Sequence, residues 1–289
     1  MSRPPRDKEA TIWEHLEELA YRLRRALIAF AIVAIILSLL PASLVGGAGA
    51  GARFFYKPLV LEFPTIIFRH IVPPTIRALD GNVYNVTVMP ERGFESVEVI
   101  GLSVLLLGLL GASPFIAREL WAYIEPALYN HEKRFLQRYS VLFALAFVFG
   151  VFFAIYIVAP LVMRMVLALY PWLVPHEYLT VIRVSVKEVL SFALKLSIAF
   201  GLFFDLPVAL YLLLAYGVLD PELFGKDTMK YILVGSMIAG AIVSPDPSGV
   251  GMLAIGLSLY LPMHVAITLG KKRALERRRM EEVEAKAVP

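Results

Sequence analysis

The sequence predicts an all-α integral membrane protein with six transmembrane helices. Of its 289 residues, 58% are hydrophobic and only 18% are charged, and the mean hydropathy is +0.70. A soluble domain of this length is less apolar than that. A helix needs about 20 apolar residues to cross a bilayer. Six runs reach or approach that length, at 25–47, 97–112, 141–162, 189–216, 231–243 and 250–269.

The first run follows a charged segment, residues 1–24. This segment has no small-residue cleavage site after a short apolar core, so the segment is expected to belong to the mature protein. The loop 48–95 comes next. Its stretch YKPLVLEFPTIIFRHIVPPTIRAL mixes apolar and basic residues at roughly helical spacing. This pattern predicts an external interfacial helix on the membrane surface. A helix that packs back onto the external ends of the spans fits equally well.

The fifth run, 231–243, is the shortest of the six. Its 13 residues rise by ~20 Å as a helix, which is less than the ~30 Å hydrocarbon core. We therefore expect the bilayer to thin beside it. The sixth run leads into a charged segment, so the chain divides into a membrane domain, 1–270, and a charged cytoplasmic tail, 271–289.

Lysine and arginine residues predict the orientation, because basic residues near the ends of helices resist translocation. With six crossings, the two termini and the loops 113–138 and 217–230 share one side and hold 19 Lys and Arg residues. The longer opposite loops hold only eight. Both termini are therefore expected in the cytoplasm of a multi-pass protein of the cell membrane.

The second run is followed by an unusual stretch, SPFIARELWAYIEPALYNHEKR, at residues 113–134. Pro114 is expected to end the helix, Trp121 and Tyr123 suit the headgroup level, and Pro126 interrupts the chain again. Physical chemistry alone favours an interfacial loop with basic flanks. The order of prolines, aromatic residues and charges is more specific than such a loop requires.

This stretch resembles the first cytoplasmic loop of TatC, the C subunit of the twin-arginine protein translocase. Other segments resemble the same family in order: HLEELAYRL at 15–23, the prolines at 58, 64 and 90, FGLFFDLPVAL at 200–210, and SPDPSGVGMLAIGL at 244–257. The loop match rests on Pro114, Trp121, Tyr123, Pro126, Ala127, Leu128, Tyr129, Glu132, Lys133 and Arg134. The resemblance covers about residues 12–260.

Several positions depart from the family pattern, which identifies a divergent member. Ala20 stands where the family has Arg, Asp205 where it has Glu, and Val250 where it has a polar side chain. Leu261 lies where an acidic residue is common, and the external loop is longer than usual.

The resemblance implies a receptor and scaffold subunit that binds twin-arginine signal peptides of folded precursor proteins at the cytoplasmic face. It also implies single-span TatA/TatB-like partner subunits, a homo-oligomeric complex and the proton-motive force as energy source. Carboxylates bind guanidinium groups by paired hydrogen bonds, so Glu18 and Glu132 are the principal candidates. The alternative role for both is helix capping. The rest of this candidate site is Trp121, Tyr123, Lys133 and Arg134.

Asp205 lies within the fourth apolar run, where a carboxylate must face protein or water. Pro207 frees a backbone carbonyl one turn earlier, so the two residues predict a polar groove inside the membrane. The alternative is a secondary transporter of small solutes or ions with Asp205 as its proton or ion site. A structural assembly factor is a third possibility.

Two more groups of residues have expected roles. Met237, Asp246 and Val250 are expected to dock a partner helix, and Pro58, Pro114 and Pro126 to shape loops. The five histidines are scattered, and neither a phosphate-binding loop nor any cysteine is present, so we expect no enzymatic activity, metal or cofactor.

Overall fold

The computed structural model describes residues 12–45, 56–78, 81–124, 133–174, 181–244 and 249–287. The side chains of 12–15, 44–45, 117, 120–124, 133–140, 172 and 281–287 are outside this description. The elements are α1 (Ile12–Leu39), η1 (Ala42–Val45), α2 (Leu59–Ile71), β1 (Thr75–Arg77), β2 (Val83–Met89), α3 (Glu95–Ile124), α4 (Lys133–Phe153), η3 (Ala154–Val158), α5 (Ala159–Leu173), β3 (Val181–Ser185), α6 (Val186–Ala215), η5 (Pro221–Phe224), α7 (Lys226–Val243) and α8 (Val250–Ala287).

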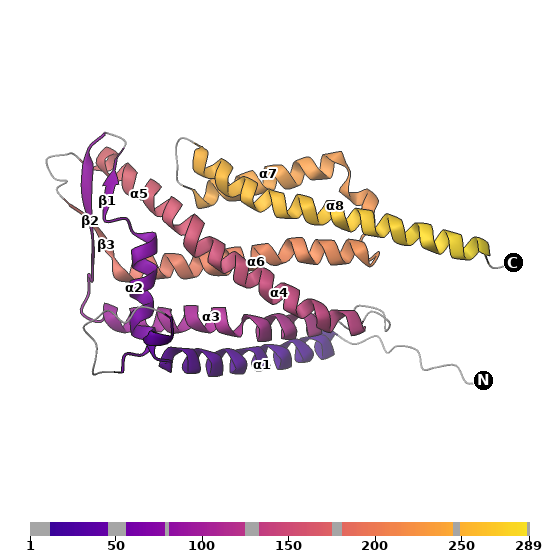
Figure 1. Cartoon of the computed structure of the whole chain (residues 1–289), viewed down its shortest axis with the longest axis horizontal. Helices are drawn as coiled ribbons and strands as arrows, with labels where there is room; N and C mark the ends of the chain where they lie inside the picture. Colours follow the sequence, from indigo (N-terminus) through magenta and orange to yellow (C-terminus); the bar gives the residue numbers. More distant parts are fainter. Residues whose placement is uncertain are drawn as a thin grey trace.

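The long helices lie side by side, with a small sheet and α2 at one end (Figure 1). We call this the sheet end. The start of α1 and the end of α8 lie at the opposite end, with the ends of α3 and α6 and the starts of α4 and α7 (Figure 1). We call this the terminal end. The segments α4, η3 and α5 follow one another as a single helical path that crosses the bundle diagonally (Figure 1).

Within the described ranges, four helical stretches are long and apolar enough to cross a membrane: Glu95–Ile116, Val141–Pro171, Val186–Ala215 and Val250–Met280. The other two expected spans form the helices α1 and α7. These two helices contain too many charged residues to be counted with the four. Every 18-residue stretch of α1 contains three arginines, and α7 contains two lysines and an aspartate. The protein is thus a membrane protein with several apolar helices, and the count of six spans stays a prediction.

The expectation of an all-α protein is wrong at the sheet end. A three-stranded sheet has the order β1-β2-β3, with β2 antiparallel to β1 and parallel to β3. Its central strand, VYNVTVM, is rich in β-branched residues and alternates between exposed and more buried side chains, which favours a strand. Tyr84 and Ile182 turn inward and are buried. The sheet therefore joins two loops that are far apart in the sequence.

The helix expected in the loop 48–95 is present as α2, and it lies across the long helices (Figure 1); its external side stays a prediction. Its face formed by Leu59, Val60, Phe63, Pro64, Ile67 and Ile71 is buried in the hydrophobic core of the protein. Of the two expectations for this segment, packing onto the ends of the other helices describes this face. Pro58 precedes the helix in an extended conformation.

Pro114 does not end its helix, contrary to expectation, because α3 continues to Ile124. Proline lacks the N–H that would bind the carbonyl four residues earlier, which here belongs to Leu110. The Ser113 hydroxyl donates a 2.9 Å hydrogen bond to that carbonyl. The neighbouring side chain thus satisfies the group that the proline leaves open, and the helix remains continuous.

Glycines allow two helix pairs to touch closely, as small residues do in membrane bundles. A Cβ on Gly150 of α4 would lie 2.4 Å from the carbonyl oxygen of Phe200 in α6. A Cβ on Gly240 of α7 would lie 2.5 Å from the carbonyl oxygen of Met252 in α8. Larger side chains at these positions would force the helices apart.

A hydrogen-bonded carboxylate fastens the start of α3 to the sheet end. Glu95 is only 3% exposed. Its Oε1 accepts hydrogen bonds from the Ser185 hydroxyl at 2.7 Å and the Lys187 N–H at 2.8 Å. Its Oε2 accepts from the N–H groups of Glu91 and of Arg92, the latter at 3.2 Å. One side chain therefore connects the loop after β2 with the start of α6.

Basic side chains of α8 fasten the α6–α7 connection at the terminal end. Lys271 donates to the Phe224 carbonyl at 2.8 Å, Arg277 to the Tyr216 carbonyl at 2.7 Å, and Arg278 to Asp220 at 3.1 Å. The helix α8 passes through residues 270 and 271 without interruption. The division into a membrane domain and a tail at that point stays a prediction.

Candidate functional site

Two helices bring the candidate residues together at the terminal end. They run antiparallel, with Gly108 of α3 against Phe30 and Ala34 of α1 (Figure 1). Further along the same seam, Glu119 of α3 lies against Arg25 of α1. Glu18 lies seven residues before Arg25 on the same face of α1, toward the end of α3. The seam between α1 and α3 therefore leads to the loop that carries the 113–134 motif.

The structure describes only part of the predicted signal-peptide site. Trp121 and Tyr123 belong to the last turn of α3, and Lys133 and Arg134 to the first turn of α4. The side chains of these four residues lie outside the described part. Pro126, Glu132 and Asp246 lie outside the described residues altogether.

Glu18 is already engaged by a neighbour on its own helix. Arg22 donates a 3.0 Å hydrogen bond from its Nε to Glu18 Oε1, and one terminal guanidinium nitrogen approaches the same oxygen. The Glu18 side chain is 32% exposed and the Arg22 side chain is 22% exposed. This i,i+4 pair is accessible and of low strength, so an incoming guanidinium group could replace it.

A third carboxylate, Glu119, lies deeper in the seam and was absent from the residues that the sequence suggested. Its Oε1 is 3.4 Å from a terminal nitrogen of Arg25. Its side chain is 11% exposed, and Oε2 is buried without a hydrogen-bond partner in the described structure. The sequence feature that could have pointed to Glu119 is its position four residues before Tyr123, because residues four apart share a face of a helix.

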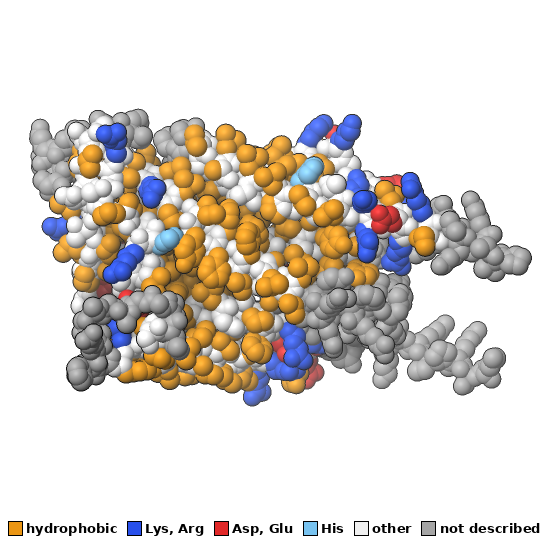
Figure 2. All heavy atoms as spheres, in the orientation of Figure 1, with side chains coloured by type: hydrophobic (Ala, Val, Ile, Leu, Met, Phe, Trp, Pro, Cys, Tyr) orange, Lys and Arg blue, Asp and Glu red, His pale blue; other side chains and the backbone are white. Residues whose placement is uncertain are grey.

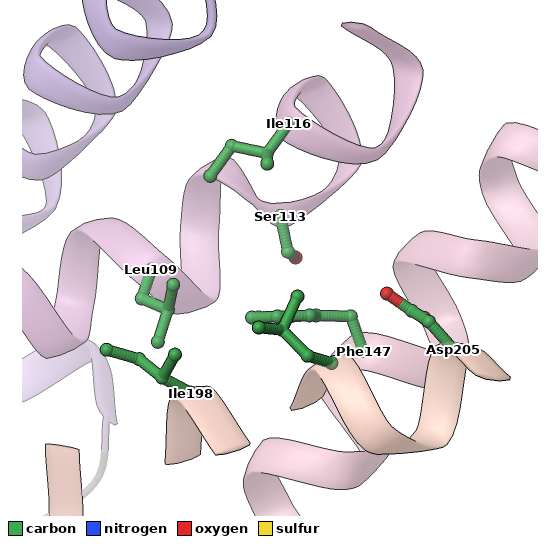
Figure 3. A pocket seen from close by; sticks show the side chains of 7 residues that line it. Leu109, Ser113, Ile116, Phe147, Ile198 and Asp205 are labelled. Atoms are coloured by element: carbon green, nitrogen blue, oxygen red, sulfur yellow. The ribbon is translucent and has the colours of Figure 1, made fainter. Parts of the chain in front are cut away.

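Asp205 faces a mainly apolar cavity at the side of the bundle (Figure 3). A cavity of about 120 Å³, partly open to the surface, lies between α3, α4 and α6. It is lined by Leu109, Ser113, Ile116, Phe147, Ile198, Leu202 and Asp205. Asp205 Oδ1 is buried without a hydrogen-bond partner in the described structure. The cavity can therefore receive a chemical group that donates a hydrogen bond.

Pro207 lies two residues beyond Asp205, within α6. A proline there leaves the Phe203 carbonyl without its helical partner. This polar notch is nearer to the terminal end than to the sheet end, because α6 runs toward the terminal end (Figure 1).

The predicted docking residues take different positions on α7 and α8. Met237 packs against Gly256 of α8, which makes it part of the helix contact. Val250 begins α8 and is 62% exposed. The outward face of α7 presents Val234, Ile238 and Ile242.

The surface separates apolar and charged side chains along the long axis. Hydrophobic side chains cover the middle of the face in Figure 2, and charged side chains gather toward the ends, with many basic ones at the terminal end. These features are those of a multi-pass helical membrane protein with carboxylates at one end and, among the described residues, a carboxylate between α3, α4 and α6 with one buried oxygen that has no partner.

Comparison with known proteins identifies the family. Residues 14–257 match the family "Sec-independent protein translocase protein (TatC)". The TatC proteins of Aquifex aeolicus and Escherichia coli K12 are 34% and 27% identical to the chain, over 94% and 77% of its length and 98% and 82% of theirs. The chain belongs to the TatC family, and it is therefore a subunit of a protein translocase.

Solved structures agree with this assignment. A crystal structure described as the twin arginine translocase receptor TatC is 32% identical, with a TM-score of 0.59, and the match covers 90% of this chain and 99% of that one. A second, described as the same receptor in DDM, gives a TM-score of 0.61 over 89% and 100% of the two chains. Membership in this family does not favour the small-solute transporter.

Proposed function

We propose that this protein is the receptor and scaffold subunit of twin-arginine export. It binds the paired arginines of signal peptides on folded precursor proteins, at the terminal end, which faces the cytoplasm. The observation that carries the proposal is the convergence of carboxylates on the seam that leads to the 113–134 motif. The related crystal structures are themselves described as translocase receptors.

The chemistry of recognition follows from the guanidinium group. A carboxylate can accept two parallel N–H hydrogen bonds from arginine, and these charge-assisted bonds are stronger than neutral ones. Glu18 and Glu132 supply the carboxylates, Trp121 and Tyr123 form the wall beside them, and Lys133 and Arg134 complete the site at the start of α4. Glu17, next to Glu18, can partly substitute for it.

Replacement of Glu132 tests this proposal. A hydrogen bond to a charged group contributes about 1.5–3 kcal/mol, so Glu132→Ala should weaken binding of a twin-arginine peptide by roughly one to two decades. Glu132→Gln should weaken it nearly as much, because the lost contribution is charge. Glu18→Ala should have a smaller effect. Binding is measured on purified protein in nanodiscs.

The matched control for these variants is Glu222→Gln, which removes an exposed carboxylate from the α6–α7 connection at the same end of the molecule. It should leave the affinity unchanged. Normal affinity of a folded, membrane-inserted Glu132→Ala variant would contradict the receptor proposal.

We also propose that the protein resides in the cell membrane with both termini in the cytoplasm and the sheet end outside. The natural chain contains no cysteine, so single introduced cysteines report their side without interference. Asp246→Cys should react with an impermeant reagent added outside, and Asn130→Cys should not. Labelling of Asn130→Cys from outside would reverse the orientation.

Single-span TatA/TatB-like subunits are the proposed partners, in a complex with several copies of this chain. Their helices dock on α7 and on the turn before α8, near Asp246 and Val250. The 18 residues of α7 rise by about 27 Å, so the helix is longer than the 13-residue apolar run and comes close to the ~30 Å hydrocarbon core. The notch at Asp205 and Pro207 offers a polar contact inside the membrane.

Crosslinking tests the docking surface. A photo-crosslinker at Ile242, which is 80% exposed, or at Val250 should capture a single-span subunit. The matched position is Met237, which faces Gly256 within the protein and should capture less. Failure of both Ile242 and Val250 to capture such a subunit would remove this docking surface.

A further inference from the structure

Arginines of α1 occupy both described carboxylates in the seam between α1 and α3. Arg22 binds Glu18, and Arg25 approaches Glu119. The two arginines are three residues apart, so they project from the same face of the helix. The helix α1 thus places its own guanidinium groups against carboxylates of the kind that the proposed peptide requires.

The contact between Arg25 and Glu119 is incomplete. Arg25 is half in solvent, with 50% of its side chain exposed, and its guanidinium nitrogen is 3.4 Å from Glu119 Oε1. No hydrogen bond reaches Glu119 Oε2 within the described structure, although that atom is buried. A buried carboxylate oxygen without a donor is unfavourable. The site therefore favours a second donor that reaches further into the seam.

The position of Glu119 connects it to the proposed peptide site. It lies two residues before Trp121 and four before Tyr123 on α3. The same seam holds Glu18 about two turns of α1 from Arg25. A peptide arginine that enters beside Glu18 can follow the seam to Glu119, where a guanidinium group can supply two parallel N–H donors.

We propose that Glu119 is a third carboxylate of the arginine site, and that Arg25 is a resident guanidinium that one arginine of the signal peptide displaces. This inference rests on the proposed receptor function. It identifies the ligand group as a guanidinium, because only a planar fork can bind both carboxylate oxygens at once. It also predicts that the protein opposes peptide binding through its own Arg25.

The test is a double-mutant cycle with a twin-arginine peptide and the full chain in nanodiscs. Arg25→Gln should tighten peptide binding by about two- to fivefold, because it removes an exposed ionic competitor. Glu119→Gln should weaken binding by about tenfold. In the Glu119→Gln background, Arg25→Gln should have no further effect on affinity.

Arg24→Gln is the matched control, since it removes the same charge from the same turn of α1, about 100° around the helix. It should not tighten binding. Arg25→Lys retains the charge without the fork and should tighten binding less than Arg25→Gln does. It also keeps the test possible if the Gln variant does not fold.

The alternative is that Arg25 and Glu119 only fasten α1 to α3. In that case Arg25→Gln would lower the thermal stability and leave the affinity unchanged, or weaken it, and the inference would be wrong. Failure of the inference about Arg25 and Glu119 is distinguishable from failure of the proposed receptor function. If Glu132→Gln weakens binding while Arg25→Gln does not tighten it, the receptor function stands and only the role of Arg25 is lost.

Discussion

The carboxylates at the two ends of the bundle differ in how completely they are hydrogen-bonded. At the sheet end, Glu95 accepts hydrogen bonds from four donors in three segments of the chain. Toward the terminal end, Glu119 and Asp205 each keep a buried oxygen without a partner in the described structure. Buried polar groups in stable folds are normally satisfied.

This difference indicates a division of roles. The satisfied carboxylate at the sheet end holds loops and helices in place. The unsatisfied carboxylates lie in a seam and a cavity that remain open to a further donor. Strained or unsatisfied groups of this type are concentrated at functional sites, which supports the proposed binding role of the terminal end.

Replacement of Glu95 should give the largest change in stability. Glu95→Ala leaves the Ser185 hydroxyl and three backbone N–H groups without their acceptor. The midpoint of thermal unfolding, followed by circular dichroism in detergent, should fall by about 5 to 10 °C. The matched variant Glu98→Ala removes a carboxylate that is 47% exposed and paired with Lys187, and it should have little effect. Equal effects of the two variants would remove the distinction between the ends.

Replacement of Asp205 should shift stability in the opposite direction. Asp205→Leu removes a buried oxygen without a partner and adds apolar volume to a cavity. The unfolding midpoint should rise by about 2 to 4 °C, while export of a twin-arginine substrate in cells falls. Asp205→Asn keeps the shape and should show an intermediate loss of export. A destabilised Asp205→Leu variant would mean that this carboxylate supports the fold.

Removing one contact between the basic side chains of α8 and the α6–α7 connection should give the smallest change in stability. Arg278 and Asp220 are each 50% exposed, and exposed ion pairs contribute about 0.2–1 kcal/mol. Arg278→Ala should therefore lower the unfolding midpoint by no more than about 2 °C, and high salt should reduce the difference from the natural protein. A larger, salt-independent loss would show that the terminal end depends on polar contacts as much as the sheet end does.

The helices were predictable because long apolar runs have few alternatives in a membrane. The sheet was not, although the alternation in VYNVTVM was visible in the sequence. Its partner residues in β3 lie 96 positions later, and such long-range pairing has no local signal. The course of α3 through Pro114 depends on one hydrogen bond from Ser113, which composition does not reveal.

Glu18 and Asp205 could be proposed as site residues from the sequence because they belong to motifs that resemble a family, and their roles stay predictions. Glu119 was not predictable, since a glutamate within a charged stretch usually faces solvent. Its role depends on the antiparallel register of α1 and α3, which brings Arg25 against it. Burial and missing hydrogen bonds are properties of the packed structure and become visible only there.

Binding of two adjacent arginines at the terminal end requires that the protein distinguish their guanidinium groups from the ammonium groups of lysines. Binding of paired twin-arginine and twin-lysine peptides is compared on the natural protein in nanodiscs. An ammonium group cannot make the forked contact, so the lysine peptide should bind at least about tenfold more weakly. Equal affinity for the two peptides would contradict the account and return the 113–134 stretch to the role of an interfacial anchor.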